Sequence, residues 1–248
     1  MMKRIIALTA MCVLLTAGMA RADAPLQLAL TEDIQMVPKD QSIKGLRLNI
    51  YGANDNVMGL SLGLIHKSTG NTSGAEFGLV SMTDGEFHGL QSSWIYSTSG
   101  RFIGLQGGLV AISTGNFTGI QNGLVTITDG NFKGLQGGLV AITKGDYSGW
   151  QGGYVNWTEG RFIGLQSGIV NITKGDNSGV QVGGFNKTEG VFKGIQLGLV
   201  NSTGETNGLQ LGFINHSKML NGGLQIGLGN INENKEPFGF LPIVNWSF

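Results

Sequence analysis

The sequence is organised around one stretch, Phe132-Lys133-Gly134-Leu135-Gln136-Gly137-Gly138-Leu139-Val140-Ala141-Ile142-Thr143-Lys144-Gly145. Variants of it recur along nearly the whole chain, 15 residues apart with single-residue slips at three steps. A short fixed period over most of a chain indicates a repeat architecture. Fourteen copies are found, and the positions equivalent to Gln136 are Arg47, Ser61, Glu76, Gln91, Gln106, Gln121, Gln136, Gln151, Gln166, Gln181, Gln196, Gln210, Gln225 and Leu241.

Glycine holds fixed positions in this repeat. The chain has 43 Gly and 4 Pro among its 248 residues. A strong glycine bias can indicate disorder, but here the glycines keep the frame of the repeat. The position two before the Gln136 equivalent is Gly in all fourteen copies, and the position two after it is Gly in eleven. The composition therefore predicts periodic structure.

The first residues predict export. Lys3 and Arg4 precede an apolar core at residues 5–15, and residues 1–22 match a cleavable signal peptide. The apolar core is too short for a membrane-spanning helix. The remaining chain divides into an N-terminal extension, residues 23–44, and a repeat β domain, residues 45–248. The single cysteine lies within the signal peptide, so disulfides do not hold the predicted mature protein together. Its nearly balanced charge does not suggest nucleic acid as a partner.

Each repeat predicts a β-strand with two faces, because its residues alternate with period 2. One face carries Phe132, Gly134 and Gln136 and continues through Val140 and Ile142. The opposite face is apolar at mid-strand, as at Leu135 and Leu139. Short pairs that end in Gly, such as those at residues 129–130 and 144–145, separate the strands and are typical of hairpin turns.

These features predict an all-β fold, an antiparallel up-and-down meander of about 14 strands closed into a barrel. Turns that alternate between Lys-Gly and Glu-Gly support this prediction, because successive turns of a meander lie at opposite rims. A dozen residues tilted in a barrel would cross a bilayer. The apolar face would then contact lipid.

The alternative is a β-solenoid of 15-residue coils, which would bury its leucines and display its glutamines. One observation favours it, because a stacked parallel coil would align identical asparagines into a ladder. Six asparagines occupy one repeat position: Asn156, Asn171, Asn186, Asn201, Asn215 and Asn230.

The pattern Gly-Leu-Gln-x-Gly-Leu-Val-Asn, as in residues 194–201, resembles an uncharacterised family of bacterial surface-repeat proteins. The resemblance covers roughly residues 45–248 and implies a location in the cell envelope, with no known activity. The aromatic C-terminal residue, Phe248, resembles the assembly signal of bacterial outer-membrane β-barrel proteins. It is the candidate assembly signal, which implies the β-barrel assembly machinery as a partner.

The glutamine row is the most distinctive candidate site. It could line a polar channel or form a sugar-binding surface, or its side-chain amides could satisfy one another in a ladder, which is the favoured interpretation. The candidate lumen-lining residues are Gln91, Gln106, Gln121, Gln136, Gln151, Gln166, Gln181, Gln196, Gln210 and Gln225.

Other motifs do not indicate an enzyme. Residues 59–63 match the nucleophile elbow G-x-S-x-G, but they are a copy of the repeat with Ser61 in the Gln position, and no helix pattern follows. The three histidines lack metal-ligand spacing. No catalytic residue, metal site or cofactor is therefore predicted.

The predicted function is that of an integral outer-membrane β-barrel protein, with outer-membrane lipid as its partner and a structural or passive small-solute passage role. The alternative is a surface-exposed β-solenoid that acts as an adhesin or scaffold.

Overall fold

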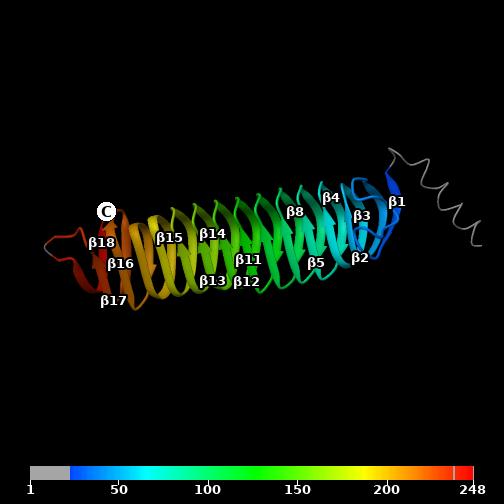
Figure 1. Cartoon of the computed structure of the whole chain (residues 1–248). Coiled ribbons are helices and arrows are strands. Elements are labelled where there is room, and N and C mark those ends of the chain that lie inside the picture. The colour runs from blue at the N-terminus through cyan, green and yellow to red at the C-terminus, as the bar shows by residue number, and fades with distance from the viewer. Residues whose placement is uncertain (1–22, 237, 248) are drawn as a thin grey trace, which may run out of the picture.

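The chain folds into a rod of stacked coils. The computed structural model describes residues 23–236 and 238–247, and the coils follow one another along a single axis (Figure 1). All of the described strands belong to one sheet system that winds around the rod. Their bounds are β1 (Ala24–Ala29), β2 (Ile43–Asn54), β3 (Val57–Ser68), β4 (Thr72–Phe77), β5 (Val80–Thr83), β6 (Phe87–Ser92), β7 (Ile95–Thr98), β8 (Phe102–Gly107), β9 (Val110–Ser113), β10 (Phe117–Asn122), β11 (Val125–Thr128), β12 (Phe132–Thr143), β13 (Tyr147–Thr158), β14 (Phe162–Thr173), β15 (Asn177–Leu211), β16 (Ile214–Leu220), β17 (Gly223–Asn232) and β18 (Phe240–Ser247).

Neighbouring copies of the repeat run parallel and in register, so the predicted antiparallel meander and barrel are wrong. In the pairing of β12 with β13, Phe132 faces Tyr147 and Gln136 faces Gln151. The fold is a β-solenoid of about 14 turns. The physical reason lies in the number of bends. Each repeat bends twice, once at the Gly-closed pair and once after the glutamine, so the chain circles the axis and meets the next copy in the same direction.

The parallel stacking of the coils also explains the alternating charges in the turns. Lys144 Nζ lies 2.7 Å from Asp129 Oδ1, and Lys174 Nζ lies 3.0 Å from Glu159 Oε1. Each pair joins neighbouring coils. Residues stacked in one row of a sheet destabilise it when they carry like charges. The two-repeat period therefore reflects charge alternation along one edge of the rod.

The interior follows the predicted alternation only through the glutamine. Phe132 and Gln136 are buried, and the next buried residues are Ala141 and Thr143, so the alternation slips by one at the bend of residues 137–140. Val140 and Ile142, predicted on the same face as Gln136, consequently point outward. We name each row of stacked equivalent residues after its member in this coil, and we call the bend the Gly-Gly corner.

The regular spacing of the coils depends on the glycine that precedes each glutamine by two positions. Gly149 has φ of 136°, a region that side chains with Cβ rarely adopt. A Cβ added there would overlap the carbonyl oxygen of Gly134 in the preceding coil. This row therefore requires glycine for both its backbone angle and its close contact with the neighbouring backbone.

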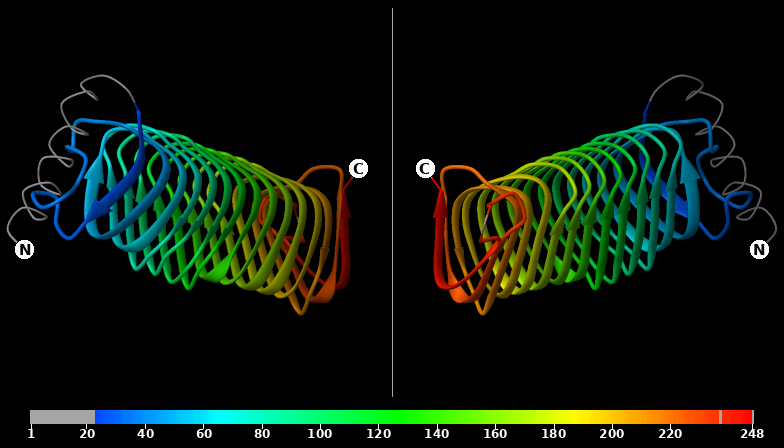
Figure 2. Two further views of the ribbon diagram at one scale, coloured as in Figure 1. Left: turned by 90° about the vertical axis from the view of Figure 1, so that its right-hand side faces the viewer. Right: turned by 90° about the vertical axis from the view of Figure 1, so that its left-hand side faces the viewer.

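Both ends of the rod are closed by other structure. At the N-terminal end, β1 pairs in parallel with β2, and the segment after it folds back and buries Val37 against Ala24 and Ile43. At the C-terminal end, β18 pairs with β17 in the antiparallel direction. Figure 2 views the rod toward each end and shows the coils as flattened loops of similar outline. The last copy of the repeat is therefore a cap and not a further coil.

Candidate functional site

The ten predicted lumen-lining glutamines lie in the packed interior of the solenoid. Each is at most 2 % exposed, and the side chains form a continuous ladder. In the central part, Gln136 Nε2 donates to Gln121 Oε1 at 2.9 Å, and Gln151 Nε2 donates to Gln136 Oε1 at 2.9 Å. The remaining links of the ladder repeat this geometry at 2.6–3.1 Å. The glutamine amides thus satisfy one another in the core.

Charged groups close the glutamine ladder at both ends. At the N-terminal end, Gln91 Nε2 donates to Glu76 Oε1 at 3.1 Å, and Arg47 Nη2 lies 2.6 Å from Glu76 Oε2. At the other end, Asn245 Nδ2 donates to Gln225 Oε1, and Lys235 Nζ donates to Asn245 Oδ1 at 2.9 Å.

These ends fix the direction of every amide in the ladder. An ionised carboxylate can only accept hydrogen bonds and an ammonium can only donate them. The N–H groups therefore all point toward the N-terminal end, where the carboxylate lies, and the carbonyl oxygens point toward the ammonium. Aligned dipoles are stabilised by opposite charge at each end, as in a helix.

Two titratable groups of this end have shifted pKa values. Arg47 is buried, and desolvation lowers its pKa, although Glu76 opposes that shift. Desolvation also lowers the pKa of His66, whose Nε2 lies 2.9 Å from the carbonyl oxygen of Phe77. Small Ser61 lies in the row between Arg47 and Glu76 and accepts a hydrogen bond from Arg47 Nε at 3.0 Å. This arrangement lets Arg47 reach the carboxylate of Glu76 two coils away, so the two buried charges neutralise each other within the core.

A second ladder, formed by the six asparagines, supports the Gly-Gly corner. Asn171 Nδ2 donates to Asn186 Oδ1 at 2.8 Å and to the backbone oxygen of Val182 at 2.9 Å. The asparagines donate toward the C-terminal end, opposite to the glutamines. Asn156 begins this ladder, and its Oδ1 has no hydrogen-bond partner, because the preceding coil carries Ala141 at this position. The hydrogen bonds of the two ladders therefore give the buried amide side chains a structural role.

The outer surface of the Gly-Gly corner is apolar along most of the rod. Three outward-facing rows form it, and we call them the apolar ridge. The Gly137 row lies between two of them; it is apolar toward both ends of the rod, as at Leu48 and Ile226, and holds Gly, Ser or Asn in the middle, as at Ser92 and Asn122. The Leu139 row forms the crest and consists of Ile50, Leu64, Leu79, Trp94, Leu109, Leu124, Leu139, Tyr154, Ile169, Gly184, Leu199, Phe213 and Leu228. The Leu135 row and the Val140 row flank the crest and are similarly aliphatic and aromatic, for example at Trp150, Ile195 and Ile214. The leucines are thus outside and the glutamines inside, so the leucine burial expected in a solenoid is not found.

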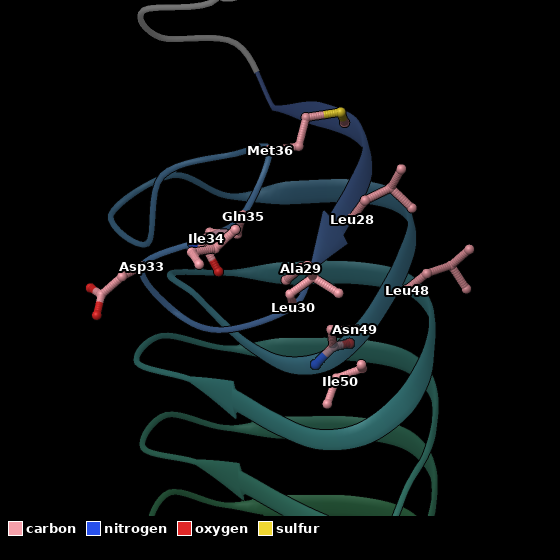
Figure 3. Close-up of a pocket in the computed structure, with 10 residues that line it drawn as sticks. All are labelled: Leu28, Ala29, Leu30, Asp33, Ile34, Gln35, Met36, Leu48, Asn49 and Ile50. Atoms are coloured by element: carbon pink, nitrogen blue, oxygen red, sulfur yellow. The ribbon is translucent and has the colours of Figure 1, made fainter.

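A hollow of about 680 Å³ lies beside β1 at the N-terminal end. Figure 3 shows the residues that line it, from Leu28 to Met36 on β1 and the segment that follows, and from Leu48 to Ile50 on β2. Asp33 is the one acidic residue in this lining and points away from the rod. The hollow continues the apolar ridge onto the cap, because Ile50 belongs to both surfaces.

Two predicted features fall outside the described residues: the signal peptide of residues 1–22 and the candidate assembly signal Phe248. Across residues 23–236 and 238–247, no helix is long and apolar enough to cross a membrane. The same residues contain no group of three or more His, Cys, Asp or Glu side chains placed to hold a metal ion.

Sequence reasoning missed the apolar ridge as a feature of a solenoid, although it identified the Leu135 and Leu139 rows as outward-facing in the barrel. The period-2 alternation did not reveal it, because it shifts by one residue at the glycine pair, where no side chain marks the shift. After this shift the Val140 row joins the two leucine rows on the outside. Comparison of the chain with protein-family models, with curated proteins and with solved structures finds no match.

Proposed function

We propose that this chain is an exported, non-enzymatic β-solenoid that serves as a rigid scaffold at the bacterial cell surface, within the group of surface-repeat proteins that its repeats resemble. The observation that carries this proposal is the continuity of the two side-chain ladders along the rod. Buried polar groups that are fully hydrogen-bonded make a core rigid. A stack of about 14 coils extends over ~65 Å at the usual ~4.8 Å between strands.

The polar side chains support a structural role rather than a chemical one. The glutamines, the asparagines, Arg47 and Glu76 are engaged with one another inside the rod. The charged side chains at the turns pair between neighbouring coils, as Lys144 does with Asp129. A scaffold needs a repeated surface and a fixed length, and both follow from this arrangement.

Two measurements test the proposal, one of the protein's location in the cell and one of its shape in solution. Intact cells are treated with an impermeant biotinylation reagent, and the purified protein is measured by small-angle X-ray scattering. We expect labelling of exposed lysines such as Lys144 in intact cells, and a rod with a maximum dimension somewhat above the ~65 Å of the coil stack. Protein that is labelled only after cell lysis, or a compact scattering envelope, would contradict the scaffold role.

A further inference from the structure

The apolar ridge is larger than the apolar patches of ordinary soluble proteins. Its crest extends from Ile50 to Leu228, or ~60 Å at ~4.8 Å per coil. From the Leu135 row to the Val140 row the chain advances five residues, or ~16 Å at ~3.3 Å per residue, so the ridge covers ~1,000 Å² before the neighbouring Ile142 row is included. Patches at or above this size on a monomer mark interaction surfaces. The ridge therefore has an occupant.

The ridge is convex, which favours a deformable occupant over a rigid one. The crest follows the outside of a bend in every coil. Its residue projects clearly beyond the flank at Ile169, which is 60 % exposed against 36 % for Leu165, and the two are similarly exposed at Leu109 and Leu105, with 44 % and 47 %. Two convex ridges of identical rods would touch along a line and bury little of either flank. Lipid chains rearrange around a convex surface, so a bilayer can cover the crest and both flanks at once.

The backbone of the crest is satisfied within the protein, as burial in lipid requires. Leu139 N–H donates to the carbonyl oxygen of Leu124 at 2.9 Å, and Leu109 N–H donates to that of Trp94 at 2.9 Å. On the inner side of the corner, the asparagine ladder donates to further carbonyl groups, such as that of Val182. The corner can therefore leave water without losing these hydrogen bonds.

The charges that border the ridge are positive. The Lys133 row and the Ile142 row lie just beyond its flanks, and among the described coils their charged members apart from histidine are lysines: Lys44, Lys67, Lys133, Lys187 and Lys193. Exposed carboxylates of the coils lie at the Gly-closed turns, as Asp129 and Glu159 do. One turn carboxylate, Glu189, pairs with Lys187 at 2.8 Å. Lysine side chains beside an apolar surface keep their stems in the apolar layer while the ammonium reaches the headgroups.

The spacing of these rows matches shallow insertion. Three residues separate the Leu139 row from the Ile142 row, or ~10 Å along the strand. Helices that lie at a membrane interface bury their apolar face by about 5–10 Å, and they carry basic residues above it. A rod that inserts its crest to this depth would place the lysines at the level of anionic headgroups.

We propose that the apolar ridge binds the surface of a lipid bilayer that contains anionic lipid, with the long axis of the rod parallel to the membrane plane. The crest enters the acyl region and the flanking lysines contact headgroup phosphates. This inference rests on the proposed scaffold function, for which it supplies the partner.

Flotation with vesicles tests the binding. The purified protein is mixed with vesicles of phosphatidylcholine and phosphatidylglycerol in equal parts, or of phosphatidylcholine alone. We expect the protein to float with both vesicles and more strongly with the anionic ones. Leu124→Asp places a carboxylate on the crest and should weaken binding about tenfold or more, since a buried carboxylate in lipid is costly. The matched control is Asn116→Asp, which adds the same charge to the same coil at the turn edge and should leave binding unchanged.

A neutral variant and a depth measurement keep the test independent of added charge. Leu109→Ser, Leu124→Ser and Leu139→Ser together remove apolar surface from the crest, and circular dichroism verifies that the coils remain folded. In a variant that retains Trp94 as its one tryptophan, brominated phosphatidylcholine should quench the fluorescence. Lys133→Gln with Lys193→Gln should reduce the preference for anionic vesicles while binding to phosphatidylcholine persists.

The outcomes separate the two proposals. Protein that does not float, or that floats equally well as Leu124→Asp, overturns the lipid assignment even when surface labelling supports the scaffold. A stable dimer in sedimentation velocity without vesicles, which Leu124→Asp dissociates, would identify a second copy as the occupant and also overturn it. Vesicle binding by a protein that cells retain inside would instead leave the ridge assignment standing and overturn the proposed location.

Discussion

Two sections of the rod fill the same outline with different interiors. From β6 to β14, six aromatic side chains stack in the Phe132 row, with ring centroids 4.6–5.0 Å apart. Before β13 the position beside the Gly-Gly corner is mostly small, as at Ala111 and Ala141. Asparagines fill it from β13 onward, so β13 and β14 carry both a stacked ring and an asparagine. From β15 onward the Phe132 row becomes irregular, with Asn177, Phe192 and Thr206. The glutamine ladder runs through both sections.

This difference shows which features the coil requires and which it can exchange. The glycine row and the glutamine row continue through both sections, so they set the spacing and the register. The interior is filled by stacked rings near the turns in one section, by an amide ladder near the corner in the other, and by both in β13 and β14. Identical residues in neighbouring coils stabilise both kinds of interior, because rings and amides each interact favourably with a copy of themselves one coil away.

The largest expected effect comes from the feature that both sections share. Gly149→Ala should destabilise the protein by about 4–6 kcal/mol, the combined cost of a strained backbone angle and of overpacking against the Gly134 carbonyl. The free energy of unfolding is measured by chemical denaturation. Gly107→Ala is the control, since a Cβ there meets nothing within 4 Å. Equal stability of the two variants would show that the glycine row does not set the coil spacing.

The next effect compares a stacked ring with an unstacked one. Phe132→Ala and Phe192→Ala each remove a fully buried ring and should cost about 3–4 kcal/mol. Phe132 stacks between Phe117 and Tyr147, whereas Phe192 lies between Asn177 and Thr206 in its row. Phe132→Ala should therefore cost more by about 1 kcal/mol. An equal loss in denaturation experiments would mean that stacking adds nothing beyond burial.

A smaller effect extends the asparagine ladder into the aromatic section. Ala141→Asn would place an amide beside Asn156 Oδ1, which lacks a hydrogen-bond partner. We expect stabilisation of about 1 kcal/mol, because Asn156 Oδ1 gains its donor and the hydroxyl of Thr126, one coil before, can donate to the Oδ1 of the new amide. Calorimetry measures the shift of the melting temperature. Ala111→Asn, which has no asparagine in the next coil, is the control, and stabilisation by both substitutions would refute the ladder explanation.

The smallest effect concerns His66, which occupies the corner position before the asparagines begin. Its pKa in the folded state lies below its unfolded value, so the unfolded state binds more protons at mildly acidic pH. Stability is therefore retained above pH ~6.5 and falls as the pH decreases below it. His66→Asn should abolish this dependence in thermal melts between pH 7.5 and 5. Exposed His88→Asn should keep it, and a pH response common to both variants would assign it to other groups.

The repeat length and the row identities could be read from the sequence, but the direction of the strands could not. The spacing of Gln136 and its equivalents gave the rows, and the spacing of Asn156 and its equivalents indicated a stacked ladder. The pair Lys144-Gly145 looks the same in a hairpin turn and in a solenoid turn. The choice between them depends on a second bend at Gly137 and Gly138, and two glycines carry no pattern that distinguishes a bend from a strand.

The placement of apolar and polar residues was the second obstacle. General experience places Leu135 inside and Gln136 outside in a soluble solenoid. Here an amide can pair with its copies above and below, so the cost of burying it largely disappears. The ion pair of Arg47 with Glu76 at the end of this row was also missed. Its signal was the replacement of glutamine in the first three copies by Arg, Ser and Glu.

The one-way direction of the glutamine ladder has a consequence for how this gene product can change in size. Every interior rung donates and accepts in the same sense, so a duplicated or deleted 15-residue unit leaves each remaining amide with an equivalent neighbour. The charged residues at its two ends, Glu76 and Lys235, are the exception, because a copy of either one within the row would interrupt the chain of amide hydrogen bonds. The rod can thus lengthen or shorten in steps of one coil, while its two end structures stay the same.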